Sequence, residues 1–144
     1  MEYLINKISN NIIDKSSNIT NCIKYVNNYV SNDWLELKNN FPLENNKKYY
    51  KHIIFKNNLC ELILIKWDKD TISKIHKHPK NGCIMKLLEG SIREERYCDK
   101  EIYQVNNIKE NSTSYMHDIL GEHRIIALEE SYSLHLYSPP NFYN

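Results

Sequence analysis

Three histidines carry the strongest chemical signal in this sequence. His76 and His78 are two residues apart, and on an extended strand two such residues point to the same face. His123 follows Gly121 much later in the chain, at the start of another expected strand. Two imidazoles from one strand and a third from a facing strand form a facial ligand set for a metal ion and leave the opposite coordination positions open. An HxH pair alone is more often an ordinary surface feature, so the interpretation depends on the residues around it.

The elements that must position these histidines are expected to be short strands. From residue 49 onward, β-branched and aromatic segments alternate with turn residues, which is typical of a sandwich, a jelly roll or a small barrel. The three glycines, at positions 82, 90 and 121, separate such segments, and each is expected to be there for a backbone reason. The predicted strands are Tyr49–Phe55, Leu59–Trp67, Cys83–Glu89, Ser91–Tyr97, Ser114–His117, His123–Leu128 and Ser131–Tyr137.

The N-terminal part of the chain has a different pattern, which predicts helices. A capping pair at Ser17-Asn18 precedes apolar residues at helical spacing, from Ile19 to Val30, and Asn32-Asp33 precedes a second short helix. We therefore predict one domain over residues 1–144, with a helical portion over 1–45 and a β-barrel over 48–140.

Length and composition limit the function further. The chain has 144 residues, is 41% hydrophobic and has a formal net charge of +1. This near-neutral balance offers no basic excess to neutralise phosphates, so we expect no nucleic-acid partner. No apolar run is long enough to span a bilayer, and the start lacks the features of a secretory signal. We expect a soluble, cytoplasmic monomer without a membrane partner, in which the four cysteines are reduced thiols.

The residues around the histidines resemble the two cupin motifs. The stretch from His76 to Gly90 follows the first motif, in which HxH, four residues, usually Glu, and six further residues precede Gly. Cys83 stands where that Glu ligand usually lies. Gly121-Glu-His123 resembles the second motif. The resemblance implies a mainly β, cupin-type, jelly-roll-like barrel with short N-terminal helices.

The exchange at Cys83 is typical of the thiol dioxygenase branch of the cupins. The end of the chain, SLHLYSPP over residues 133–140, resembles the signature end of the cysteine dioxygenase family, and the match covers roughly residues 48–140. The resemblance implies that Fe(2+) is bound by His76, His78 and His123, that Cys83 and Tyr137 form a thioether cross-link, and that His135 and Ser133 form a hydrogen-bond relay behind a catalytic Tyr137.

The residue types also suit this chemistry. Three neutral imidazoles leave iron(II) with its full charge, whereas a Glu ligand would cancel half of it and occupy one position. The open positions make room for a thiolate, an amine and dioxygen, and a metal-bound thiol loses its proton. Transfer of both oxygen atoms to sulfur gives a sulfinic acid. The partners expected are therefore a small thiol and O2.

The substrate itself is less well defined by the sequence. The family binds the substrate carboxylate with an arginine in an early Tyr-x-Arg pattern, and the best register here places Tyr50 and His52 at those two positions. A one-residue slip offers Lys51 instead. A histidine lacks the two-pronged donor of arginine. L-cysteine is the first expectation; another small thiol, the N-terminal cysteine of a peptide, or a metal-binding cupin that is a non-catalytic binding module are the alternatives.

Two further expectations concern charged residues near the expected site. Arg93 and Arg96 lie on a strand rich in charge and are expected to face solvent. Asp118 is a candidate acceptor that could orient a ligand imidazole.

Overall fold

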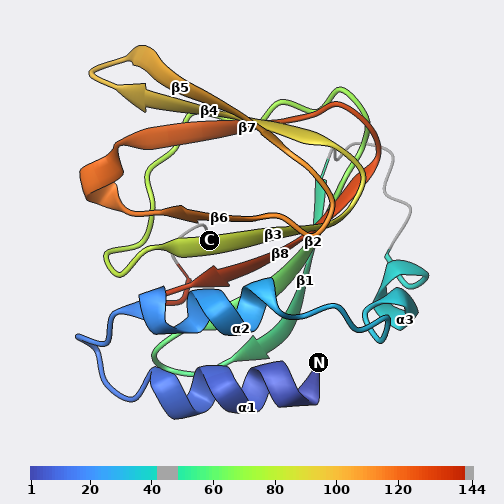
Figure 1. The fold of residues 1–144 in the computed structure, drawn as a ribbon, viewed down its shortest axis with the longest axis vertical. Helices are drawn as coiled ribbons and strands as arrows, with labels where there is room; N and C mark the ends of the chain where they lie inside the picture. The colour runs from blue at the N-terminus through green and yellow to red at the C-terminus, as the bar shows by residue number, and fades with distance from the viewer. Residues whose placement is uncertain (42–48, 142–144) are drawn as a thin grey trace.

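The computed structural model describes residues 1–41 and 49–141 and confirms a mainly β protein with a few short helices (Figure 1). Eight strands occur among these residues, and they form two antiparallel sheets. The strands are β1 (Tyr49–Lys56), β2 (Glu61–Trp67), β3 (Cys83–Glu89), β4 (Ile92–Cys98), β5 (Glu101–Ile108), β6 (Thr113–Met116), β7 (Glu122–Ala127) and β8 (Ser131–Tyr137). The helices are α1 (Glu2–Asn11), α2 (Ile23–Asn27) and α3 (Leu35–Lys38), with 3-10 turns η1 (Ile19–Cys22) and η2 (Asp118–Leu120).

The two sheets face one another across the interior (Figure 1). The larger sheet has the order β1-β2-β8-β3-β6 and the smaller one the order β5-β4-β7. The chain between β2 and β3 also runs along the edge of β7, where isolated bridges pair Ile72 with Ile126 and His76 with His123. The predicted HxH pair therefore lies on an extended segment held against β7, outside the named strands.

Strand β8 is buried along its whole length and serves both faces of the larger sheet. Its residues alternate, as strand geometry requires. Leu134 and Leu136 pack into the cluster beneath the N-terminal helices. Tyr137, on the opposite face, packs with Ile92 and Ile125 of the smaller sheet. One strand thus supports the helical layer with one face and lines the interior with the other.

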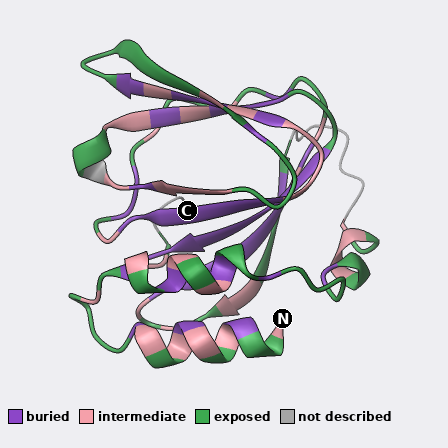
Figure 2. Cartoon of the chain, viewed as in Figure 1, coloured by how far each residue is buried: buried purple, intermediate pink, exposed green. Residues whose placement is uncertain are grey.

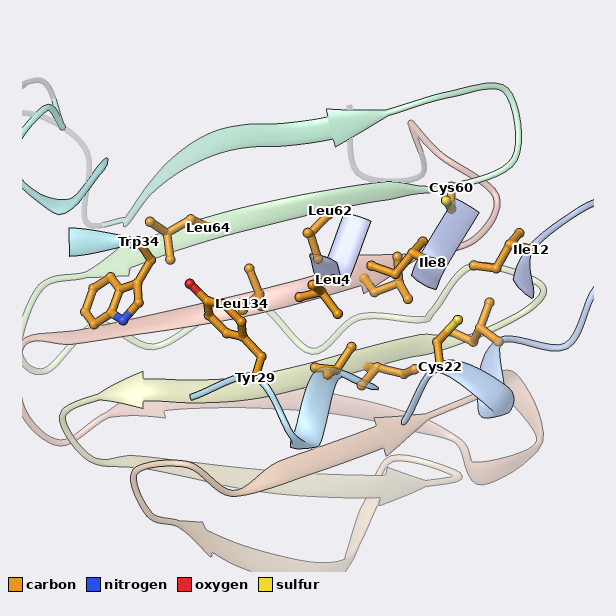
Figure 3. Close-up of a cluster of buried hydrophobic side chains, with 14 of the residues drawn as sticks. Leu4, Ile8, Ile12, Cys22, Tyr29, Trp34, Cys60, Leu62, Leu64 and Leu134 are labelled. Atoms are coloured by element: carbon orange, nitrogen blue, oxygen red, sulfur yellow. The ribbon is translucent and has the colours of Figure 1, made fainter. Parts of the chain in front are cut away.

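The N-terminal helices cover the outer face of the larger sheet. Leu4 and Ile8 of α1 and Val26 of α2 are buried against Leu62 and Leu134 of the central strands (Figure 3). The helix surfaces that point away from the sheet are largely exposed, whereas the central strands are buried (Figure 2). Burial of this apolar face, rather than the helix propensity of such short segments, stabilises the helices.

A buried lysine ties the helical layer to the sheet. Lys86 of β3 is 0% exposed, and its Nζ donates hydrogen bonds to the carbonyl oxygens of Asn27, at 2.7 Å, and Tyr29, at 2.5 Å. Carbonyl groups at the end of a helix have no partner within the helix. Lys86 therefore satisfies backbone acceptors at the end of α2 from the neighbouring layer.

The glycine expectation is confirmed, because all three glycines have positive φ angles. Gly90, between β3 and β4, has a φ of 103°, and a Cβ atom there would collide with Ser131. Only glycine adopts this backbone conformation at low cost.

Some details differ from the sequence prediction. The cap at Asn18 is present, since its side chain accepts a hydrogen bond from Thr20 N at 3.0 Å, but a 3-10 turn follows it and α2 ends at Asn27. Val30, expected on the apolar helix face, is 72% exposed. Strand β5 was not predicted at all. The predicted boundaries at residues 45 and 48 lie outside the described residues.

Candidate metal centre

The structure brings the three predicted histidines together. One ring nitrogen from each of His76, His78 and His123 lies within 4.8 Å of the others. The backbone positions two of them, because His76 N donates to His123 O at 2.9 Å and His123 N donates to His76 O at 3.1 Å. His78 and His123 are 1% and 4% exposed. The donor set is three imidazoles and contains no carboxylate.

Hydrogen bonds fix the protonation of two of these rings. Nδ1 of His76 lies 2.7 Å from the carbonyl oxygen of Lys74, and Nδ1 of His123 lies 2.8 Å from Oε2 of Glu94. Both partners are acceptors, so each Nδ1 carries the proton and each Nε2 presents a lone pair. The two Nε2 atoms are only 2.9 Å apart. Two lone pairs at this distance repel one another, and a shared cation relieves the repulsion.

Burial keeps the imidazoles in the form that binds metals. Burial and the neighbouring His123 lower the pKa of His76 to about 4. The same two causes lower the pKa of His78 to about 2. Both rings are therefore neutral at pH 7, which is the state that a metal ligand requires.

The acceptor behind His123 is Glu94 of β4, a residue that the sequence analysis missed. Glu94 is 0% exposed and also accepts hydrogen bonds from Arg96 Nε, Asn106 Nδ2 and Ser114 Oγ, at 3.0, 3.0 and 3.1 Å. Burial alone would raise the pKa of Glu94, but the hydrogen bonds from His123 and Asn106 and the charge of Arg96 together lower it to about 2. The carboxylate is therefore ionised at neutral pH.

Arg96 was expected to face solvent, but it points to the interior. Its side chain is only 12% exposed, and its guanidinium contacts Glu94, Ser114 Oγ at 3.1 Å and the Tyr115 carbonyl at 2.9 Å. The alternation of side chains along β4 could have indicated the inward position of Arg96. Ile92 faces the interior, and residues 94 and 96 lie on the same face. Arg93 is partly exposed, nearer to the expectation. The side chain of Asp118, the acceptor considered from the sequence, lies outside the described part of the chain.

The predicted relay residues are in contact on the inner face of β8. Ser133 Oγ accepts the indole N–H of Trp67 at 2.7 Å and lies 2.7 Å from Nε2 of His135. Nδ1 of His135 lies 3.0 Å from the hydroxyl of Tyr137. Burial, followed by the charge of Lys51, holds the pKa of His135 well below its usual value, so this imidazole is neutral.

Cys83 and Tyr137 lie side by side in the larger sheet. They are directly opposite one another in the β3–β8 register, and they are 3% and 5% exposed. Burial and the nearby Glu94 carboxylate raise the pKa of the Cys83 thiol, and the Tyr137 hydroxyl offsets part of this shift. The two predicted cross-link partners are therefore adjacent.

Tyr50 and His52 are not brought to the histidines. His52 pairs with Leu64, whose side chain packs beneath the helices, and its ring lies 6.4 Å from that of Phe41. Tyr50 shares this outward face. Lys51, the residue that a one-residue slip offers instead, pairs with Ile65 and points to the inner face. Such a slip exchanges the two faces of a strand.

Comparison with known proteins shows the family to which the chain belongs. Residues 2–143 match the family model described as cysteine dioxygenase type I. The chain belongs to this family. Its relatives include cysteine dioxygenase type 1 of Danio rerio, 28% identical over 97% of this chain and 75% of that protein. The Rattus norvegicus protein of the same name is 31% identical over 65% of this chain and 52% of its own length.

This member of the cysteine dioxygenase family matches only part of the length of its relatives. The chain spans about half of the mammalian relatives that it matches, and three quarters of the zebrafish one. No helix among the described residues is long and apolar enough to cross a membrane.

Solved structures place this cysteine dioxygenase family member in the cupin fold. KdgF from Halomonas sp. superimposes with a TM-score of 0.57 over 71% of this chain and 94% of its own, at 17% identity. An RmlC-like cupin from Shewanella frigidimarina gives a TM-score of 0.56 over 72% of this chain and 88% of its own, at 14% identity. At these identities the likeness concerns the fold alone, and it confirms the predicted cupin barrel.

Proposed function

We propose that this chain is a mononuclear non-haem iron(II) thiol dioxygenase that oxidises L-cysteine with O2 to cysteine sulfinic acid. The observation that carries the proposal is the convergence of three imidazole nitrogens, with the Nδ1 protons of His76 and His123 already engaged. The adjacent Cys83–Tyr137 pair in the larger sheet supports it. The net reaction is R–SH + O2 → R–SO2H. Both oxygen atoms go to sulfur, so no further reductant is needed.

His76, His78 and His123 would hold the iron through one ring nitrogen each. The bound iron supplies affinity for a thiolate and the redox chemistry that dioxygen requires. A set of three neutral donors suits this role, because it occupies one side of the ion and does not cancel its charge. The proposal takes the monomer as the working unit.

Lys51 would bind the substrate carboxylate. It lies on the inner face of β1, and its positive charge acts on His135. An ammonium group attracts a carboxylate as a point charge, but it lacks the two parallel donors of a guanidinium. The site would therefore bind a substrate carboxylate with less selectivity than a site that contains an arginine.

Tyr137 would orient the substrate and oxygen through its hydroxyl. We assign the Ser133 hydroxyl as donor to Nε2 of His135, so that Nδ1–H of His135 donates to the Tyr137 oxygen. The proton of Tyr137 is then directed towards its Cys83 and substrate side. A thioether between Cys83 and Tyr137 would hold the phenol in this orientation.

A second candidate is a dioxygenase for another small thiol or for the N-terminal cysteine of a peptide. The single point charge of Lys51 favours it, because substrates that lack a free carboxylate lose less binding energy here. A cupin that binds metal without catalysis is the remaining alternative, and it differs in that it would not consume oxygen.

The proposal is tested by oxygen uptake with iron(II)-loaded protein, first with L-cysteine and then with 3-mercaptopropionate, cysteamine and a peptide that begins with cysteine. Mass spectrometry of the products should show stoichiometric addition of two oxygen atoms to cysteine. His78→Ala is the control and should lose both iron and activity. Iron binding without oxygen uptake from any of the thiols would contradict the proposal and support a binding module.

A further inference from the structure

Glu94 places a carboxylate behind a site whose own donor set contains none. Its Oε2 accepts the Nδ1–H of His123 at 2.8 Å, so the carboxylate is one hydrogen bond away from a proposed metal ligand. Glu94 is fully buried and holds three further donors, so its orientation is fixed. A carboxylate in this position sets the tautomer and the direction of the imidazole.

The same carboxylate also brings a negative charge to the interior. A carboxylate behind an imidazole raises its basicity and transfers negative charge towards the metal. That effect partly restores the negative charge that a Glu ligand would bring and that is missing here, because Cys83 stands in its place. Charges act strongly on one another in a buried environment.

Arg96 forms an ion pair with Glu94 and so compensates this charge. Its Nε lies 3.0 Å from Oε1 of Glu94, while Oε2 of the same carboxylate faces His123. Its guanidinium is held in place by Ser114 and the Tyr115 carbonyl. The two side chains are on the inner face of β4, two residues apart, so the strand places them together.

We propose that Glu94 is a positioning residue for His123 and that Arg96 compensates its charge. The pair orients the imidazole with a carboxylate and adds little net charge to the metal centre. This inference rests on the proposed metal role of the three histidines. It assigns a function to two residues of β4 that bind neither metal nor substrate.

The two residues are predicted to have opposite effects on metal affinity. Glu94→Gln removes the negative charge and weakens the hold on the His123 proton, so the affinity for a divalent ion should fall by about 10–100-fold. Arg96→Gln keeps a polar side chain but leaves the Glu94 charge uncompensated, so the affinity should rise by about tenfold. Arg96→Lys preserves the charge and is the matched control, with affinity within about twofold of the unaltered protein.

The measurement is titration with Co2+, whose visible spectrum also reports the coordination geometry, together with a thermal melt of each metal-free variant. Opposite changes in affinity, with an altered Co2+ spectrum for Glu94→Gln, are the expected result. A purely structural role predicts that both Gln variants lose affinity together with thermal stability, and that outcome overturns the inference, as does no change in either. If Arg96→Gln does not fold, Glu94→Gln against Arg96→Lys decides, because equal losses in both contradict a role for charge.

The same titration separates this inference from the proposed function. If the unaltered protein binds no Co2+ in a way that depends on His78, the metal site itself is wrong, and the inference falls with it. If it binds Co2+ and the two Gln variants do not diverge, only the role of Glu94 and Arg96 is wrong.

Discussion

At the scale of single residues, hydrogen bonds to protein groups orient the imidazoles of His76, His123 and His135. Nδ1 of His76 is held by a backbone carbonyl, Nδ1 of His123 by a carboxylate, and the His135 ring lies between Ser133 and Tyr137. Fixed partners define the tautomers before any ligand binds. The energetic cost of ordering these rings is therefore met during folding, and binding does not have to supply it.

The first prediction concerns the substrate carboxylate. Lys51→Ala should raise the KM for L-cysteine by about tenfold or more, because a charge-assisted hydrogen bond is lost. The KM for cysteamine, which has no carboxylate, should stay within about twofold. His52→Ala is the control, since that side chain lies on the opposite face of β1 and should leave both constants unchanged. A larger effect from His52 than from Lys51 would contradict the assignment.

The second prediction concerns Cys83 and Tyr137. After turnover with iron and O2, peptide mass spectrometry should show a species that has lost two hydrogen atoms, mapped to these two residues. O2 is the oxidant for this bond between the sulfur and the ring. Cys83→Ser and Tyr137→Phe should each abolish the species. Both side chains remaining unlinked after many turnovers would refute it.

At the scale of elements, the parts that the sequence predicted are those with a one-sided or continuous apolar pattern. Strands β2, β3 and β8 are buried almost throughout and were found within two residues of their bounds. Strand β5 was missed because six of its eight residues are exposed, so no buried face imposes an alternation. The register of β1 was ambiguous for the same reason, since exposed residues occupy both of its faces.

The candidate site follows the same division. The histidines, Cys83 and the relay on β8 could be predicted because their types and spacing form motifs. Glu94 was not assigned, because a run of charged residues on a strand usually faces solvent. Its burial is explained by four hydrogen-bond partners, and three of them, Asn106, Ser114 and His123, lie 12, 20 and 29 residues further along the chain.

The third prediction tests the attachment of the helices to the barrel. Lys86→Met retains most of the side-chain volume but leaves the carbonyl groups of Asn27 and Tyr29 without their buried donor. The free energy of unfolding should fall by about 3 kcal/mol, measured by urea denaturation. Lys80→Met, at an exposed lysine, should change it by less than about 0.5 kcal/mol. Equal effects of the two substitutions would rule out this role for Lys86.

At the scale of the whole molecule, helices and barrel share one hydrophobic cluster. Leu4 and Ile8 pack in the same cluster as Leu62 and Leu134, so neither part can be removed without exposing the other. The predicted single domain implies that both parts unfold together. The chain contains two tryptophans, one in each part, and this allows a direct test.

The fourth prediction uses these tryptophans. Trp67→Phe leaves Trp34 to report on the helical portion, and Trp34→Phe leaves Trp67 to report on the barrel. In each variant the urea transition seen by tryptophan fluorescence should coincide with that seen by circular dichroism. An earlier transition at Trp34 would show that the helical portion unfolds on its own.

Strand β8, which carries the relay, and strand β1, which carries Lys51, differ in how freely evolution can alter them. Every residue of β8 is buried, and all of them except Ser131 belong either to the cluster beneath the helices or to the relay, so almost any substitution there should damage stability or chemistry. The inner face of β1 is open to solvent at Lys51, and Ile53 is 50% exposed. If Lys51 binds the substrate as proposed, a change at that edge should alter which thiol is preferred without disturbing the core. New substrate preferences should therefore arise first on β1, while β8 keeps the reaction the same.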